Sequence, residues 1–125
     1  MSLLELTIVI SAMLSLLSIL FVGARAWKKG SDRAGCILNI RNVLQAVRGY
    51  ANVKNLGEGA DLLSSEIYDN STETSASNTV YMKTPICPTA GSYTPKVKVP
   101  ILGTLYITCS NSSTIQHEPT DYATW

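Results

Sequence analysis

The first part of the chain is apolar on every side, a pattern typical of a helix that lies in a membrane. Leu6 to Ala24 contains no ionisable residue, and about 20 apolar residues are enough to cross a hydrocarbon core ~30 Å thick. We therefore expect residues 1–24 to form a hydrophobic transmembrane helix. Glu5 is the exception, because a carboxylate inside a bilayer costs about 2.5–3.5 kcal/mol and is usually paired or functional.

Residues 25–54 are predicted to continue the same helix with an amphipathic pattern. A stripe of apolar side chains recurs at three- and four-residue spacing, consisting of Ile37, Ile40, Leu44 and Val47. Such spacing places one face of a helix against a core. Gly23 and Gly30 weaken the join between the halves, since glycine costs about 1 kcal/mol relative to alanine in a helix interior. We expect helix flexibility, as a bend or local melting, at this join.

The pattern changes again in residues 55–125, which we expect to form a small globular region. "KNLGEGAD" ends the long helix, and Asp61 can cap a short second helix that ends near Tyr68. A polar loop follows, and then "TVYM", "GSYTPKVKV" and "GTLYITCS" alternate as strands do. The predicted fold class is α+β, with the long N-terminal helix packed on a small antiparallel sheet and an irregular C-terminal tail.

Charge and size narrow the possible partners. The net charge is +1, and without a clustered basic face we expect no nucleic-acid partner. The cations gather just after the apolar helix, at Arg25, Lys28, Lys29 and Arg33. By the positive-inside rule they would leave the C-terminal region in the cytoplasm. A globular part of about 70 residues is marginal alone and usually needs a staple or a partner.

The three cysteines suggest such a staple. A bridge between Cys87 and Cys109 would stabilise the fold by roughly 3 kcal/mol on the chain-entropy model, and it would require an oxidising compartment. The alternative is that these are two unrelated buried thiols. Cys36 is then either a buried helix thiol or an intermolecular link. The conflict with the positive-inside rule disappears if the chain is a processed product whose charged leader has been removed.

The chain lacks the residue patterns that are typical of enzymes and of metal sites. His117 is the only histidine and follows no catalytic or zinc spacing, so we expect no enzyme, no cofactor and no metal site. Glu118 and Asp121 offer oxygen ligands, but a solvated acidic pair explains them better. Asn70 and Asn111 begin formal glycosylation triplets, which also arise by chance in polar loops.

The opening segment fits one assembly mechanism. In a bundle of parallel, staggered helices, the Glu5 carboxylate of one subunit can meet the positive α-amine of Met1 in the next subunit. That pairing would neutralise two buried charges and fix the register between subunits. The alternative is that Glu5 lies at the lipid interface and reaches the polar headgroups.

These residues carry a family resemblance. "MSLLELTIVISAMLSLL" resembles the processed N-terminus of type IV pilins and of the pseudopilins of type II secretion, in which apolar residues flank a glutamate and a long apolar helix follows. "CPTAGSYTP" followed by "YITCS" is similar to a cysteine-containing ending of a bacterial pilin-like subgroup. The chain departs from the family where a phenylalanine usually stands at Met1 and a proline at Val22.

The resemblance implies a function. We expect a major pilin-like structural subunit of an extracellular type IV pilus-like filament, with residues 1–24 in the filament core. It implies cleavage by a prepilin peptidase, N-methylation of Met1, an inner-membrane pool, an assembly platform and a homo-oligomeric helical filament. A pseudopilin of a type II secretion system is the alternative, and a lone membrane-anchored binding domain is a third. The sequence leaves the filament's biological role open.

Overall fold

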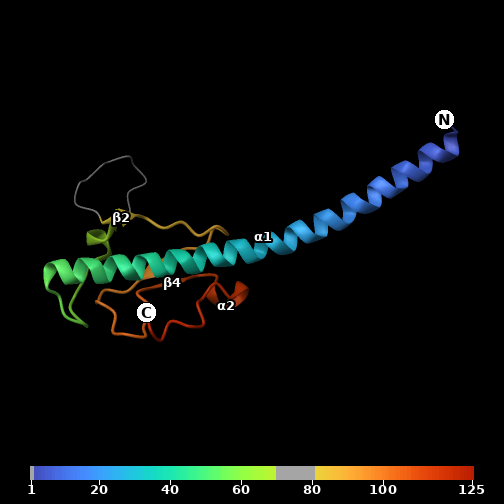
Figure 1. The fold of residues 1–125 in the computed structure, drawn as a ribbon. Coiled ribbons are helices and arrows are strands. Elements are labelled where there is room, and N and C mark those ends of the chain that lie inside the picture. Colours follow the sequence, from blue (N-terminus) through green and yellow to red (C-terminus); the bar gives the residue numbers. More distant parts are fainter. Residues whose placement is uncertain (1, 70–80) are drawn as a thin grey trace. The chain divides into compact units, whose positions relative to one another are not determined.

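One long helix forms the N-terminal part of the chain. The computed structural model describes residues 2–69 and 81–125, and α1 spans Leu3–Lys54 (Figure 1). This confirms the prediction of a single helix that contains both the apolar and the amphipathic segment. Helix α1 is uninterrupted at Gly23 and Gly30, so the expected local melting is not present in the structure. Among the described residues, α1 is the one helix long and apolar enough to cross a membrane.

The C-terminal end of α1 is fixed by its own backbone. Asn55 adopts a left-handed conformation with φ 53°, and its N–H donates to the carbonyl of Asn52 at 3.3 Å. The N–H of Leu56 donates to the carbonyl of Ala51 at 2.8 Å. These two bonds form a Schellman motif that satisfies the last carbonyls of the helix. The helix therefore ends where the sequence predicted, with asparagine instead of glycine in the left-handed position.

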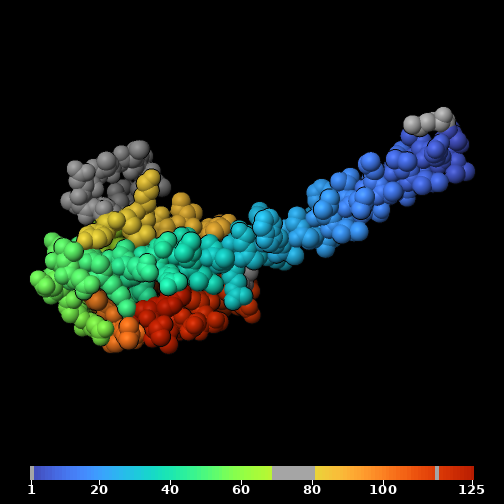
Figure 2. Space-filling view, in the orientation of Figure 1, coloured from blue at the N-terminus to red at the C-terminus, as the bar shows by residue number. Residues whose placement is uncertain are grey.

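The chain divides into two compact units, Met1–Ser31 and Asp32–Trp125. In the first unit every described residue is exposed. The second unit contains the hydrophobic core, and one wall of this core is the second half of α1. In Figure 2 this half of the helix is flanked by the yellow segment after residue 80 and by the red C-terminal segment.

The buried face of α1 is wider than the predicted stripe. It consists of Cys36, Ile40, Val43, Leu44, Val47, Tyr50 and Ala51. Ile40, Leu44 and Val47 are buried as predicted, whereas Ile37 is only half-buried. Cys36 begins the buried face in its place, because Cys36, Ile40 and Leu44 follow one another at four-residue spacing. The other side of the core comes from the strands and loops of the second unit, including Leu62, Ile67, Tyr106 and Ile107.

Two short sheets complete the α+β fold. Strand β3 (Tyr93–Pro95) pairs antiparallel with β4 (Ile107–Cys109), with Tyr93 opposite Cys109. This is the small antiparallel sheet that the sequence predicted. Strand β1 (Tyr68–Asp69) pairs with β2 (Met82–Lys83) in parallel, which the sequence did not predict. Backbone bonds from Gly59 and Leu62 to the carbonyls of Val99 and Val97 join the loop after α1 to the segment after β3.

Two local predictions need correction. The expected second helix is only the 3-10 turn η1 (Ser64–Glu66), and Tyr68 already belongs to β1. Asp61 does not cap this turn, because it pairs with Lys98 through an isolated bridge and an ion pair of 3.7 Å. The tail contains one short helix, α2 (Ser112–Ile115), which ends at Gln116 in a left-handed conformation.

Candidate functional site

The apolar half of α1 is an uncovered surface. Its large apolar side chains lie between 49% exposed at Ile10 and 81% at Leu3. Glu5 lies in the first turn of this helix, near the free N–H groups that favour an acidic side chain. Within residues 2–69 and 81–125, no cation forms an ion pair with Glu5. Met1, its expected partner in a neighbouring subunit, lies outside the described residues.

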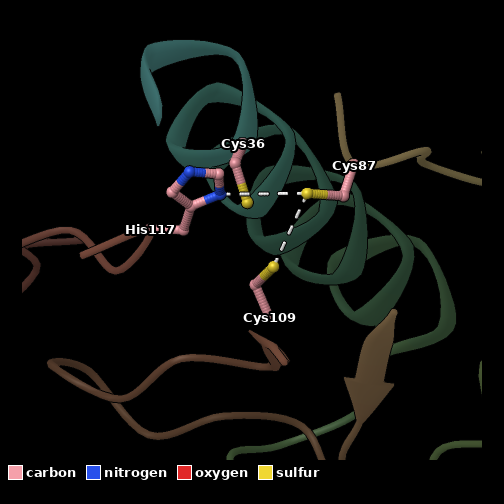
Figure 3. Close-up of side chains that lie close together, drawn as sticks. All are labelled: Cys36, Cys87, Cys109 and His117. Atoms are coloured by element: carbon pink, nitrogen blue, oxygen red, sulfur yellow. Dashed lines mark hydrogen bonds between the residues drawn. The ribbon is translucent and has the colours of Figure 1, made fainter. Parts of the chain in front are cut away.

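A second feature lies in the core of the globular unit. Cys36, Cys87, Cys109 and His117 come from four separate segments of the chain, and their side chains converge (Figure 3). Their ligand atoms all lie within 4.8 Å of one another. All four residues are buried, with at most 3% exposed. We call this group the Cys3His cluster.

Cys87 begins a tight turn, "CPTAG", that surrounds its sulfur with donors. Ala90 has φ 57°, and its N–H donates to the Cys87 carbonyl at 3.1 Å. The hydroxyl of Thr89 lies 3.3 Å from the Cys87 sulfur. Burial raises the pKa of the Cys87 thiol, but hydrogen bonds from Thr89, His117 and the backbone of Gly91 outweigh burial and lower the pKa to about 6. The Cys87 sulfur is therefore held in surroundings that favour the thiolate.

Cys36 is held from the helix side by a chain of polar contacts. The Tyr93 hydroxyl donates to the Cys36 sulfur at 3.3 Å. The Asn39 amide in turn donates to the Tyr93 oxygen at 3.2 Å and to the Ile86 carbonyl at 2.9 Å. Burial raises the pKa of Cys36 to about 12 in spite of the Tyr93 hydrogen bond. The expectation of a buried helix thiol is confirmed, since Cys36 is 0% exposed to solvent.

His117 points into the same space from the segment after α2. The residue is 0% exposed, and its Nδ1 lies 3.8 Å from the Cys87 sulfur. Its Nε2 has no hydrogen-bond partner among the described residues. Buried polar atoms are nearly always hydrogen-bonded, so a buried imidazole with an unpartnered Nε2, and with sulfur as the hydrogen-bond partner of Nδ1, requires an explanation.

The predicted disulfide is not formed in the structure. Cys87 and Cys109 are close, as the sequence suggested, but both thiols are free and their sulfurs are 3.7 Å apart. A disulfide requires an S–S distance of about 2.05 Å. Cys36 and His117 lie in the same space, so four side chains surround one centre.

The two possible glycosylation sites differ in what the structure describes. Asn70 lies outside the described residues. Asn111 is half-buried, and its Nδ2 atom donates to the Thr89 hydroxyl at 3.0 Å. The nitrogen that a glycan would occupy thus serves the fold, because it ties the segment after β4 to the turn that carries Cys87.

Only part of the Cys3His cluster could be recognised from the sequence. Cys36 has the spacing of the buried helix face, and "CPTAG" is a turn pattern that presents a cysteine. Gly35 is a further sign, since a Cβ there would lie 3.2 Å from Pro88 Cγ, where the turn packs on the helix. No periodicity indicated that His117 is buried, and the prediction of no metal site was based on the absence of paired cysteine or histidine spacing.

Comparisons with known proteins return no relative. No model of a known protein family matches the chain, and neither a curated protein nor a solved structure matches it. The structure itself has a long apolar N-terminal helix and a small antiparallel sheet, an arrangement that is compatible with a pilin-like fold.

Proposed function

We propose that this chain is the structural subunit of a type IV pilus-like filament. The observation that carries the proposal is the uncovered apolar half of α1, with a single carboxylate at Glu5. An apolar surface of this extent marks a contact with a membrane or with other proteins. A filament of parallel helices would cover it in the assembled state, and an inner membrane would cover it before assembly.

Glu5 distinguishes this proposal from a simple anchor. A lone anchor gains nothing from a carboxylate one turn inside the bilayer and loses insertion free energy. In a staggered bundle, the α-amine of Met1 from the neighbouring subunit would neutralise the carboxylate. Met1 must then be a free amino terminus. We propose that a prepilin peptidase exposes it and that it is N-methylated, as in the type IV pilins that the opening segment resembles.

The second unit supplies a folded part that can remain intact throughout assembly. Its core is formed by its own residues, so helix contacts in the first unit can change from lipid to protein without unfolding it. The exposed large apolar residues of the first unit do not contribute to that core. The proposed assembly is therefore supported by this division of roles: the first unit offers an apolar surface for contacts, and the second unit contains the folded core.

The test replaces Glu5 in cells that also express the wild-type chain. For Glu5→Ala and Glu5→Gln, we expect incorporation into sheared extracellular filaments to fall at least about tenfold, equivalent to about 1.4 kcal/mol. Glu58→Ala is the matched control, because Glu58 is an exposed carboxylate in the loop after α1. The measurements are electron microscopy of the sheared fraction and mass spectrometry of the N-terminal residue.

Each result has a defined meaning. Filaments with methylated Met1 and without the Glu5 variants support the proposal. Normal incorporation of Glu5→Ala beside the wild-type chain would show that the register mechanism is wrong. Only short periplasmic assemblies would instead identify a pseudopilin of a secretion system, and a monomeric membrane protein would identify an anchored binding domain.

A further inference from the structure

The Cys3His cluster contains every cysteine and the only histidine of the chain. The sequence has three cysteines and one histidine, and they lie on α1, on the turn before β3, on β4 and after α2. All four meet in one buried space (Figure 3). Packing alone gives no reason for every thiol of the chain and its one imidazole to gather at a single point.

Two distances between ligand atoms are close to those around a tetrahedral ion, and all of the pairs lie within 4.8 Å. With Zn–S bonds of about 2.3 Å and Zn–N bonds of about 2.0–2.1 Å, tetrahedral ligands are about 3.8 Å apart for two sulfurs and about 3.6 Å apart for sulfur and nitrogen. The Cys87 and Cys109 sulfurs are 3.7 Å apart. The Cys87 sulfur and His117 Nδ1 are 3.8 Å apart. Both distances lie close to the edges of that tetrahedron.

A disulfide explains the cluster less completely. It would join two of the three sulfurs and would leave the third thiol and the imidazole buried beside it. A metal ion uses all four groups, and His117 Nδ1, the ring nitrogen that faces the Cys87 sulfur, would be the nitrogen ligand. Soft thiolates with one imidazole favour zinc among the available divalent ions.

The surroundings suit the charge of such a site. Three thiolates and Zn²⁺ carry one net negative charge, so hydrogen-bond donors to sulfur are required. The Tyr93 hydroxyl donates to Cys36, and the Thr89 hydroxyl lies 3.3 Å from the Cys87 sulfur. Asn39 holds Tyr93 in place through a bond of 3.2 Å. Donors of this kind orient metal ligands and tune their basicity.

The absence of a side chain at Gly91 leaves space beside the Cys87 and Cys109 sulfurs. A Cβ on Gly91 would lie 3.0 Å from the Cys109 sulfur and 3.1 Å from the Cys87 sulfur. These distances are shorter than most Cβ contacts in proteins, so a side chain at this position would require the two sulfurs to shift by a few tenths of an ångström. Glycine at residue 91 therefore lets the backbone pass directly beside two sulfurs.

We propose that Cys36, Cys87, Cys109 and His117 bind one structural zinc ion. On binding, zinc displaces the remaining thiol protons to solvent, and no electron transfer is involved. The four protein ligands complete the coordination, which is typical of structural and not of catalytic zinc. The ion would link α1 to three C-terminal segments and so stabilise a core that is small for its chain length. This inference does not depend on the filament proposal.

The first test uses the wild-type full-length chain, purified in detergent without chelator. We expect about one zinc per chain by elemental analysis and three alkylatable thiols after denaturation in chelator. Cobalt(II) in place of zinc should give the visible bands of a tetrahedral thiolate site. Chelator should remove the zinc together with the near-ultraviolet circular dichroism of the second unit. These measurements need no variant and so do not depend on whether a mutant folds.

Variants assign the ligands. Cys109→Ser and His117→Gln should each lose most of the zinc, whereas Tyr93→Phe keeps all four ligands and should retain zinc with affinity lowered roughly tenfold. Glu5→Ala should retain full zinc content, so failure of the filament proposal can be distinguished from failure of this one. Zinc retained by the chain without its three cysteines would overturn the assignment. So would a Cys87–Cys109 disulfide in the native protein, or no metal uptake after reduction and reconstitution.

Discussion

The two halves of α1 contain similar residues in opposite surroundings. Leu14 is 60% exposed and Leu44 is 2% exposed, although both lie on the same continuous helix. The difference is the pattern of the flanking residues. In the first half apolar side chains face every direction, whereas in the second half they face mainly one side.

This contrast shows that one helix can be stabilised in two ways. The second half obtains its stability from the core of its own chain, which Ile40, Val43 and Val47 help to form. The first half has no covering residues within its own unit, and in the proposed filament its stability would come from a membrane or from other subunits. Loss of apolar contacts should therefore affect folding in one half and association in the other.

The largest effect expected from a single core substitution is at Leu44. Leu44→Ala should lower the free energy of unfolding of the second unit by about 2–5 kcal/mol, because it removes buried methyl groups and leaves a cavity. Leu14→Ala is the matched control and should leave this free energy unchanged within about 0.5 kcal/mol. Denaturant unfolding of the full-length chain in detergent, followed by near-ultraviolet circular dichroism, measures both.

The same two variants can also show that the two halves of α1 do not differ in this way. Equal destabilisation by Leu14→Ala and Leu44→Ala would mean that the two halves fold as one cooperative unit. In the proposed filament, Leu14→Ala should instead reduce assembly while the second unit keeps its stability.

Much of the helix could be predicted from the sequence, because its signals are local. The apolar run, the spacing of Ile40, Leu44 and Val47, and the loop after Lys54 each depend on neighbouring residues. The antiparallel pairing of β3 with β4 could be predicted as well, from alternation and turn residues. Ile37 is only half-buried, because the centre of the buried stripe is shifted by one residue toward Cys36, which is about 100° around the helix.

The Cys3His cluster could not be predicted, because its residues meet only through tertiary structure. His117 follows a short helix in a tail without periodicity, and nothing local indicates that its side chain is buried. The parallel pairing of Tyr68 with Met82 is equally non-local. Cysteine spacing alone suggested a two-residue bridge, since Cys36 is far from the others in sequence and joins them only when α1 packs on the sheet.

A second, smaller effect tests the space beside the cluster. Gly91→Ala should destabilise the second unit by about 1–3 kcal/mol, because overpacking forces neighbours to move. The Cβ would lie 2.8 Å from the Asn111 amide nitrogen as well as close to two sulfurs. Thermal unfolding monitored by circular dichroism, with zinc content measured on the same sample, gives the result.

Gly49→Ala is the control and should have the opposite sign. Gly49 lies within α1, and a Cβ there would meet nothing within 4 Å. Alanine should therefore stabilise the helix by up to about 1 kcal/mol. A Gly91→Ala chain as stable as the wild type would show that the segment beside the sulfurs is loosely packed, contrary to the tight core that distinguishes the second unit.

The smallest expected effect concerns Tyr106, which is fully buried while its hydroxyl has no hydrogen-bond partner among the described residues. Tyr106→Phe should raise the free energy of unfolding by about 1 kcal/mol at neutral pH, because an unsatisfied hydroxyl no longer has to be buried. Burial also raises the pKa of Tyr106 to about 12, so above pH 10 the unfolded chain loses this proton before the folded chain does. Wild-type stability should therefore fall faster than that of Tyr106→Phe between pH 10 and 12, by at most about 1.4 kcal/mol per pH unit.

Denaturant unfolding of both chains across this pH range measures the difference. If the free energies of unfolding of the two chains depend on pH in the same way, water reaches the Tyr106 hydroxyl, and the core of the second unit excludes water less completely than the burial of Tyr106 indicates.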